Sequence, residues 1–163
     1  MQTVTREIER ALSARLYYLA LVSTLSLPNI CSALESPNGE TVAKQYKSWC
    51  ANWFTSYPEV TSDDLYFLRC GVVHQGRLHH AKSQFSRILF TLPDGHGNVL
   101  HRNILSDALN LDLVTFCHDM INAVSIWYSA KQNDPNVVMN LPGLVQYREQ
   151  GLAPHIGGIP LIA

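Results

Sequence analysis

Apolar residues recur every three or four positions along several stretches of this chain, which is the spacing of one face of an α-helix. The first such stretch covers residues 3–25, where the apolar stripe is Val4, Ile8, Leu12, Leu16 and Leu19. Its second half is apolar on most sides, which favours a helix in the middle of a bundle or against a partner chain. Because proline lacks the backbone N–H that a helix interior needs, Pro28 is expected to end this helix.

Three further stretches have helical spacing. The aromatic residues within 41–54 fall on one face, and core packing is their expected role rather than base stacking. Thr61 and Asp64 have the spacing of a capping box, so a third helix is expected to begin there and to stop near Gly76. The longest apolar pattern follows Ser106 and predicts the longest helix, from there to about residue 132.

The period changes between residues 84 and 104, where two segments rich in β-branched and aromatic residues flank the glycine-rich segment 93–97. This arrangement predicts a β-hairpin over about 85–104. After residue 134, prolines and glycines break any long element. Residues 144–150 are expected to form one or two helical turns, followed by an extended tail.

A chain of 163 residues fits one domain with a substantial apolar core. We therefore expect a single domain, 1–163, with its core in 3–132 and a tail over 133–163. Its fold class is expected to be mainly α: an antiparallel bundle of four to five helices with the inserted hairpin and an extended C-terminal tail.

Positive charge is concentrated in the middle of the chain, although the net charge is only −1. Residues 69–102 carry five lysines or arginines against Asp94 alone, a local net charge of +4, and five of the seven histidines. Such a local excess of cations is typical of proteins that bind nucleic acid.

The cysteines and the apolar run indicate the compartment. The four cysteines are widely spaced and contain no CxxC pair, so we expect reduced thiols in a cytoplasmic protein. The apolar run 16–27 is too short to span a bilayer, and Glu7 and Glu9 precede it, which is untypical of a secretion signal. No membrane association is expected.

The common sequence motifs of metal-dependent and cofactor-dependent enzymes are missing from this chain, which disfavours those enzyme classes. His74, His79 and His80 do not repeat at the three- or four-residue spacing that places two ligands on one helical face, and the chain lacks HExxH. It also lacks the glycine-rich phosphate loop, the GxGxxG fingerprint and the GxSxG turn. We expect neither a metal nor a cofactor.

The remaining candidate is a pair of residues, Arg69 and His74, separated by four others in the third expected helix. This spacing resembles the Rx4-6H motif of the HEPN superfamily. The same spacing rule also matches Arg148 and His155 in the tail. Only the first pair follows a capped apolar helical segment and lies in the basic part of the chain, so Arg69 and His74 are the preferred site.

The resemblance implies a small helical bundle that forms a homodimer. Many members of the superfamily are metal-independent endoribonucleases of toxin–antitoxin and phage-defence systems, whereas others are non-catalytic or bind nucleotides. An antitoxin protein is accordingly a possible partner. The family often has a polar residue, frequently asparagine, directly after the arginine, and this chain has Cys70 there.

Chemistry gives each residue of the pair a role. RNA carries its own nucleophile, the 2′-hydroxyl. His74 would exchange protons as general base or acid, and Arg69 would hold the scissile phosphate. Arg77, His79 and His80 are candidates for contacts with the RNA backbone, or for a solvated loop.

Geometry leaves two arrangements open. Residues five apart on a regular α-helix point about 140° apart. Either the helix loosens at Gly71, or the two side chains meet across a dimer axis, where two subunits line one groove. In the structural alternative, Arg69 pairs with an acid such as Asp64 or Glu35 and His74 is buried.

Overall fold

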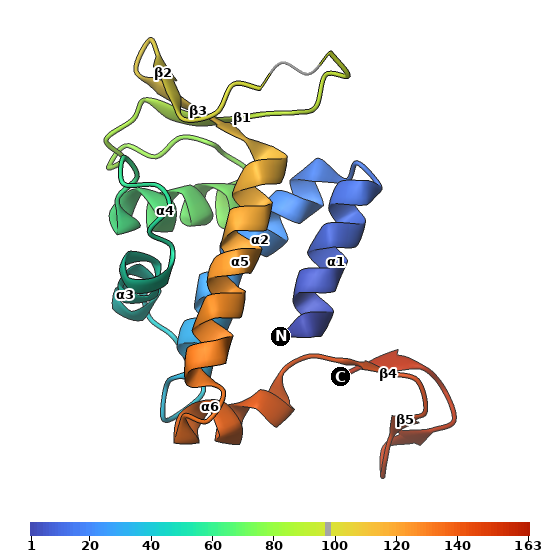
Figure 1. Ribbon diagram of the computed structural model, residues 1–163. Coiled ribbons are helices and arrows are strands. Elements are labelled where there is room, and N and C mark those ends of the chain that lie inside the picture. Colours follow the sequence, from blue (N-terminus) through green and yellow to red (C-terminus); the bar gives the residue numbers. More distant parts are fainter. Residues whose placement is uncertain (97–98) are drawn as a thin grey trace.

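The body of the protein is a bundle of helices with a small sheet at one end (Figure 1). The computed structural model describes residues 1–96 and 99–163. Within them lie six α-helices, so the prediction of a mainly α protein is confirmed, although four to five were expected. They are α1 (Gln2–Ser13), α2 (Tyr17–Leu34), α3 (Ala43–Trp53), α4 (Ser62–Arg69), α5 (Leu113–Lys131) and α6 (Pro135–Asn140).

The expected first helix is two helices. The chain reverses between α1 and α2, where Arg15 has a φ of 58°. The prediction that Pro28 ends the second of them was wrong, because α2 continues through it to Leu34. Burial of Leu25, Leu27 and Cys31 on either side of the proline favours the helix, and this tertiary packing outweighs the lost backbone hydrogen bond.

Helix α2 is the centre of the bundle and packs against α1, α3, α4 and α5. By length and composition it is long and apolar enough to cross a membrane, but half of it is buried inside the protein. The aromatic stripe of α3 lies in the same core, as predicted. Tyr46 is fully buried and donates a hydrogen bond to the carbonyl of Leu25 at 3.3 Å, and Trp49 packs edge-on against Trp127.

The sheet differs from the predicted hairpin in its pairing. Its strands are β1 (Arg87–Thr91), β2 (Asn103–Leu105) and β3 (Ala108–Asp112), and β3 lies in the centre. β1 pairs with β3 in parallel, and β2 pairs with β3 in antiparallel orientation. The first expected segment contains β1, and only the end of the second belongs to β2. Both strands pair with a third strand that was not predicted. Residue 97 of the expected turn and residue 98, which begins the second expected segment, lie outside the described residues.

The predicted start of the longest helix at Ser106 was also wrong. Ser106 and Asp107 both have positive φ and form the tight turn from β2 to β3. Strand β3 then buries Leu109 and Leu111, and α5 begins only at Leu113. Helical and strand periods are hard to distinguish over a short apolar run, and here burial within the sheet decides for the strand.

The C-terminal segment forms an arm that projects from the bundle (Figure 1). After the short 3-10 helix Leu141–Gly143, two ribbons of two strands each follow. Their strands are β4 (Tyr147–Arg148) with β7 (Leu161–Ile162), and β5 (Gly151–Leu152) with β6 (Ile156–Gly157). The helical turns expected over 144–150 are therefore absent, since this described segment is extended.

Candidate functional site

The candidate site begins with a well-capped helix. Thr61 accepts a hydrogen bond from the Asp64 N–H at 3.1 Å, and the Asp64 carboxylate accepts one from the Thr61 N–H, which confirms the predicted capping box. Helix α4 then ends at Arg69, where the chain continues as one π-helical segment, η1 (Cys70–Gln75). Gly76, with a φ of 62°, terminates it as expected.

Gly71, in the π-helix, packs closely against the backbone of the loop that follows. A Cβ atom at this position would lie 2.6 Å from the carbonyl oxygen of Arg77, which is too close for any side chain. The Arg77 N–H donates a hydrogen bond to the Gly71 carbonyl at 2.9 Å. The chain thus folds back onto the widened turn, and glycine is the residue that permits this approach.

The π-helix brings the two motif residues together. Its hydrogen bonds join residues five apart, so side chains at that spacing lie over one another instead of diverging as on an α-helix. Nη1 of Arg69 lies 2.7 Å from Nε2 of His74. The helix loosens, as in the first of the two arrangements considered, and a second subunit is not needed for the pair to meet.

The protonation of the pair follows from its geometry. A guanidinium donates hydrogen bonds and never accepts them, so Nε2 of His74 is the acceptor and the imidazole proton is on Nδ1. His74 is exposed and Arg69 is half-buried. The buried histidine of the structural alternative is thus contradicted.

The acids that were considered as partners of Arg69 bind other groups. Glu35 pairs with Lys131 and accepts a hydrogen bond from the Trp127 indole. Asp64 accepts hydrogen bonds from Thr61 and, across a loop, from Ser83 and Gln84. Burial opposes its ionisation, but these hydrogen bonds prevail and hold the pKa of the Asp64 carboxyl below its ordinary value.

Asn29 of α2 is the partner that Arg69 has instead. With the amide oxygen facing the guanidinium, Asn29 accepts hydrogen bonds from Nε at 3.0 Å and from Nη2. Sequence reasoning missed this residue, because it lies 40 positions before Arg69 on another helix and no local pattern marks it. Cys70 is close to the same cation, with Sγ 3.9 Å from Nη1.

The three residues proposed to contact an RNA backbone have different environments. The Arg77 side chain is exposed. His79 donates from Nδ1 to the Ser86 carbonyl at 2.8 Å. His80 stacks on Phe67, with ring centroids 4.4 Å apart. Both histidines therefore have structural partners, whereas Arg77 is oriented toward solvent.

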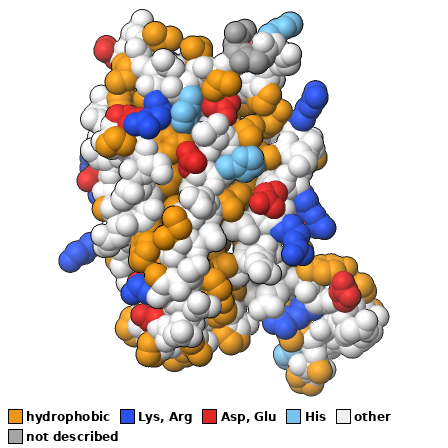
Figure 2. Space-filling view, viewed as in Figure 1, with side chains coloured by type: hydrophobic (Ala, Val, Ile, Leu, Met, Phe, Trp, Pro, Cys, Tyr) orange, Lys and Arg blue, Asp and Glu red, His pale blue; other side chains and the backbone are white. Residues whose placement is uncertain are grey.

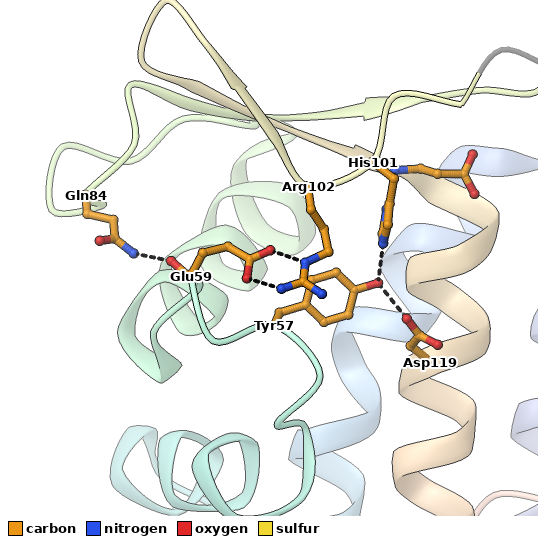
Figure 3. Close-up of polar contacts among 7 residues, drawn as sticks. Tyr57, Glu59, Gln84, His101, Arg102 and Asp119 are labelled. Atoms are coloured by element: carbon orange, nitrogen blue, oxygen red, sulfur yellow. Dashed lines mark hydrogen bonds and ion pairs between the residues drawn. The ribbon is translucent and has the colours of Figure 1, made fainter.

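A second polar cluster lies between the sheet and α5 (Figure 3). The Tyr57 hydroxyl donates to Asp119 at 2.8 Å and lies 3.4 Å from Nε2 of His101. Nδ1 of His101 accepts from the backbone N–H of Asp112, so its proton is on Nε2 and points to the tyrosine. Burial, together with the bond to Asp119, raises the pKa of Tyr57 well above its ordinary value.

An ion pair lies beside this cluster. Arg102 donates to both carboxylate oxygens of Glu59, at 2.6 and 2.8 Å, and its guanidinium lies over the Tyr57 ring. The hydrogen bonds from Arg102 lower the pKa of Glu59. These contacts join the segment before α4 to the sheet, which gives the cluster a structural role that sequence reasoning did not foresee.

Charge on the surface is mixed. On the face shown in Figure 2, acidic, basic and histidine side chains are interspersed with apolar ones and form no single basic patch. Among the described residues, no group of three or more His, Cys, Asp or Glu side chains is arranged to hold a metal ion. The cysteines are all free, and three of them are buried.

A cavity of about 570 Å³ lies between α1, α5 and the start of the arm and does not include the motif. The tail pair that shares the motif's spacing lies in the arm, with Arg148 on β4 and His155 exposed between β5 and β6.

Comparison of the chain with protein-family models, with curated proteins and with solved structures gave no match.

Proposed function

We propose that this protein is a metal-independent endoribonuclease of the HEPN type, with Arg69 and His74 as its catalytic residues. The observation that carries the proposal is the 2.7 Å approach of Nη1 of Arg69 to Nε2 of an exposed His74. A permanent cation suited to phosphate and a proton-transfer group thus lie together at the surface. The helical bundle around them is the type of fold that the resemblance to the HEPN superfamily implies.

The proposed reaction uses the nucleophile that RNA supplies. A phosphate oxygen replaces His74 as the acceptor of the Arg69 Nη1–H, which frees Nε2 to accept the proton of the 2′-hydroxyl. The 2′-oxygen forms a bond to phosphorus, and the bond from phosphorus to the 5′-oxygen breaks. The leaving oxygen takes a proton from water, and the hydroxide so formed takes the proton that His74 had accepted. Arg69 stabilises the charge on the phosphate, and the product ends in a 2′,3′-cyclic phosphate.

We further propose that the protein acts as a homodimer. Leu16, Tyr18 and Leu19, at the start of α2, are each half exposed or more. They lie next to the site, since the Tyr18 hydroxyl donates to the Val72 carbonyl of η1 at 3.4 Å. Exposed apolar side chains clustered beside a site favour a protein interface. An antitoxin protein is the partner that the family analogy suggests for the same surface.

A non-catalytic, dimeric module of the HEPN type, which binds RNA, nucleotides or a partner protein, is the second candidate. It is favoured by the closed hydrogen bond between Arg69 and His74, which occupies the histidine nitrogen needed for proton transfer. The apolar Cys70 beside the arginine agrees with it, because a polar residue is frequent there in the family. This alternative retains RNA binding through Arg69 and lacks strand cleavage.

The test is incubation with RNA in the presence of a chelator. The wild type is expected to cleave RNA to products with 2′,3′-cyclic ends, and Arg69→Ala and His74→Ala are expected to lose at least about 100-fold in rate. Arg148→Ala and His155→Ala are matched controls, since they remove the tail pair of similar spacing. Binding without cleavage supports the module, and equal cleavage by all variants refutes the nuclease.

A further inference from the structure

Asn29 determines which edge of the Arg69 guanidinium is free. When the Asn29 amide is oriented with its oxygen toward the guanidinium, that oxygen accepts from Nε and Nη2, the two donors along one edge. The reverse orientation of the amide would set its NH2 group against these N–H donors. Nη1, which lies outside this edge, contacts His74.

Asn29 is also a neutral partner, and this has an electrostatic consequence. Within residues 1–96 and 99–163, no carboxylate forms an ion pair with Arg69. A half-buried arginine is commonly paired with an acid, which would neutralise it. An amide satisfies the same donors and leaves the full positive charge available to an anion.

The position of Asn29 is maintained by the core of the bundle. It follows Pro28 in the middle of α2, a helix that packs against both α4 and η1. Pro28 and Cys31 are buried on either side of it. The amide is thus attached to a rigid element, whereas the arginine it holds lies at the junction of α4 and η1.

We propose that Asn29 is a positioning residue that orients Arg69 toward a bound phosphodiester without neutralising it. This inference rests on the proposed function, since it names the phosphate of RNA as the ligand of Arg69. Position 70 next to Arg69 is a cysteine, and in this proposal the polar group beside the arginine is the Asn29 amide, which comes from α2 across the helix interface.

Two substitutions separate orientation from charge. Asn29→Asp keeps the shape and both acceptor contacts but neutralises Arg69, whereas Asn29→Ala removes the contacts and keeps the charge. The probe is a 2′-O-methyl RNA oligonucleotide, which binds but lacks the nucleophile. Each contact between a cationic side chain and a phosphate of single-stranded RNA contributes about 0.7 to the slope of log Kd against log salt concentration. Asn29→Asp should lower this slope by about 0.7 and weaken binding, and Asn29→Ala should leave the slope unchanged.

Cleavage assays of the same variants complete the test. Asn29→Ala should lower kcat by about 10- to 100-fold, because the guanidinium still contacts phosphate but is no longer held in the geometry that the reaction needs. Asn29→Asp should mainly raise KM. Asn122→Asp, at an exposed asparagine of α5, controls for the added negative charge. If Asn29→Asp binds the probe with the wild-type slope, the inference is wrong. If the slope changes although the wild type cleaves no RNA, the inference stands and the nuclease proposal fails.

Discussion

Replacing Asp64 by asparagine should destabilise the protein strongly, although the two side chains have nearly the same size. Asp64 is 2% exposed and connects the start of α4 to the loop that follows η1. Its Oδ1 accepts from the Ser83 hydroxyl at 2.8 Å and from the Gln84 N–H at 2.9 Å. Its Oδ2 accepts from the Thr61 N–H, the Thr61 hydroxyl and the Gln84 side chain.

The magnitude follows from these donors. An asparagine has one oxygen, so its NH2 group must replace either Oδ1 or Oδ2. It then faces the backbone N–H of Gln84 or that of Thr61, and neither of these donors can rotate away. An unsatisfied buried donor costs about 1–3 kcal/mol, and the remaining hydrogen bonds lose their charge assistance. We expect a loss of about 2–4 kcal/mol in the free energy of unfolding.

The assay is urea unfolding at pH 7. With a slope of about 2 kcal/mol per molar urea, the midpoint should fall by about 1–2 M. Asp63→Asn is the matched control: this neighbouring carboxylate is exposed and paired with Lys47, so its loss should change stability by less than about 1 kcal/mol. A midpoint for Asp64→Asn within error of that control would refute the reasoning.

The same substitution predicts a pH dependence. The pKa of Asp64 is lower in the folded than in the unfolded protein, so the stability from its ionised form is present above about pH 4 and is lost as the pH falls further. The stability of Asp64→Asn should therefore decrease less steeply than that of the wild type below about pH 4. Equal slopes for the two proteins would contradict the assignment.

Three further predictions test other contacts. Gly71→Ala should lower the free energy of unfolding by at least about 2 kcal/mol in urea titrations, because its Cβ meets the Arg77 carbonyl, whereas Gly143→Ala, in open space, should cost less than about 1 kcal/mol. Tyr57→Phe should cost about 1–3 kcal/mol at pH 7 through the lost bond to Asp119. Because folding raises the Tyr57 pKa, the extra stability of the wild type over Tyr57→Phe should decrease as the pH rises above about 10. A stability difference between the two proteins that stays constant over this pH range would contradict the prediction. Asp107→Gly should raise the thermal midpoint, since glycine adopts its φ of 64° without strain, and a lower midpoint would refute this.

Local patterns predicted the beginning of the candidate site correctly. The capping box of Thr61 and Asp64, the end of the segment at Gly76 and the burial of the α3 aromatic face each depend on residues within a few positions of one another. The spacing of Arg69 and His74 was visible in the same way, but the tail pair matches the same rule. Spacing alone therefore did not establish that the two side chains meet.

Other features could not be predicted, because they depend on residues distant in the sequence. Helix α2 continues through Pro28 since its neighbours are buried against other helices. Strand β3 was mistaken for the start of α5 because its short apolar run suits either period, and its parallel pairing with β1 joins residues about 20 positions apart. In both cases burial in the assembled core outweighs local preference.

The sequence by itself thus determined a mainly α protein, the start and end of the motif segment, and the chemistry of an arginine and a histidine. Tertiary structure decided that they converge, because the approach of the Arg77 carbonyl to Gly71 accompanies a π-helix in place of an α-helix. It also decided which edge of Arg69 is free, since Asn29 reaches it from α2. Local rules act over one or two turns of helix, whereas side-chain orientation at this site depends on how three separate elements pack.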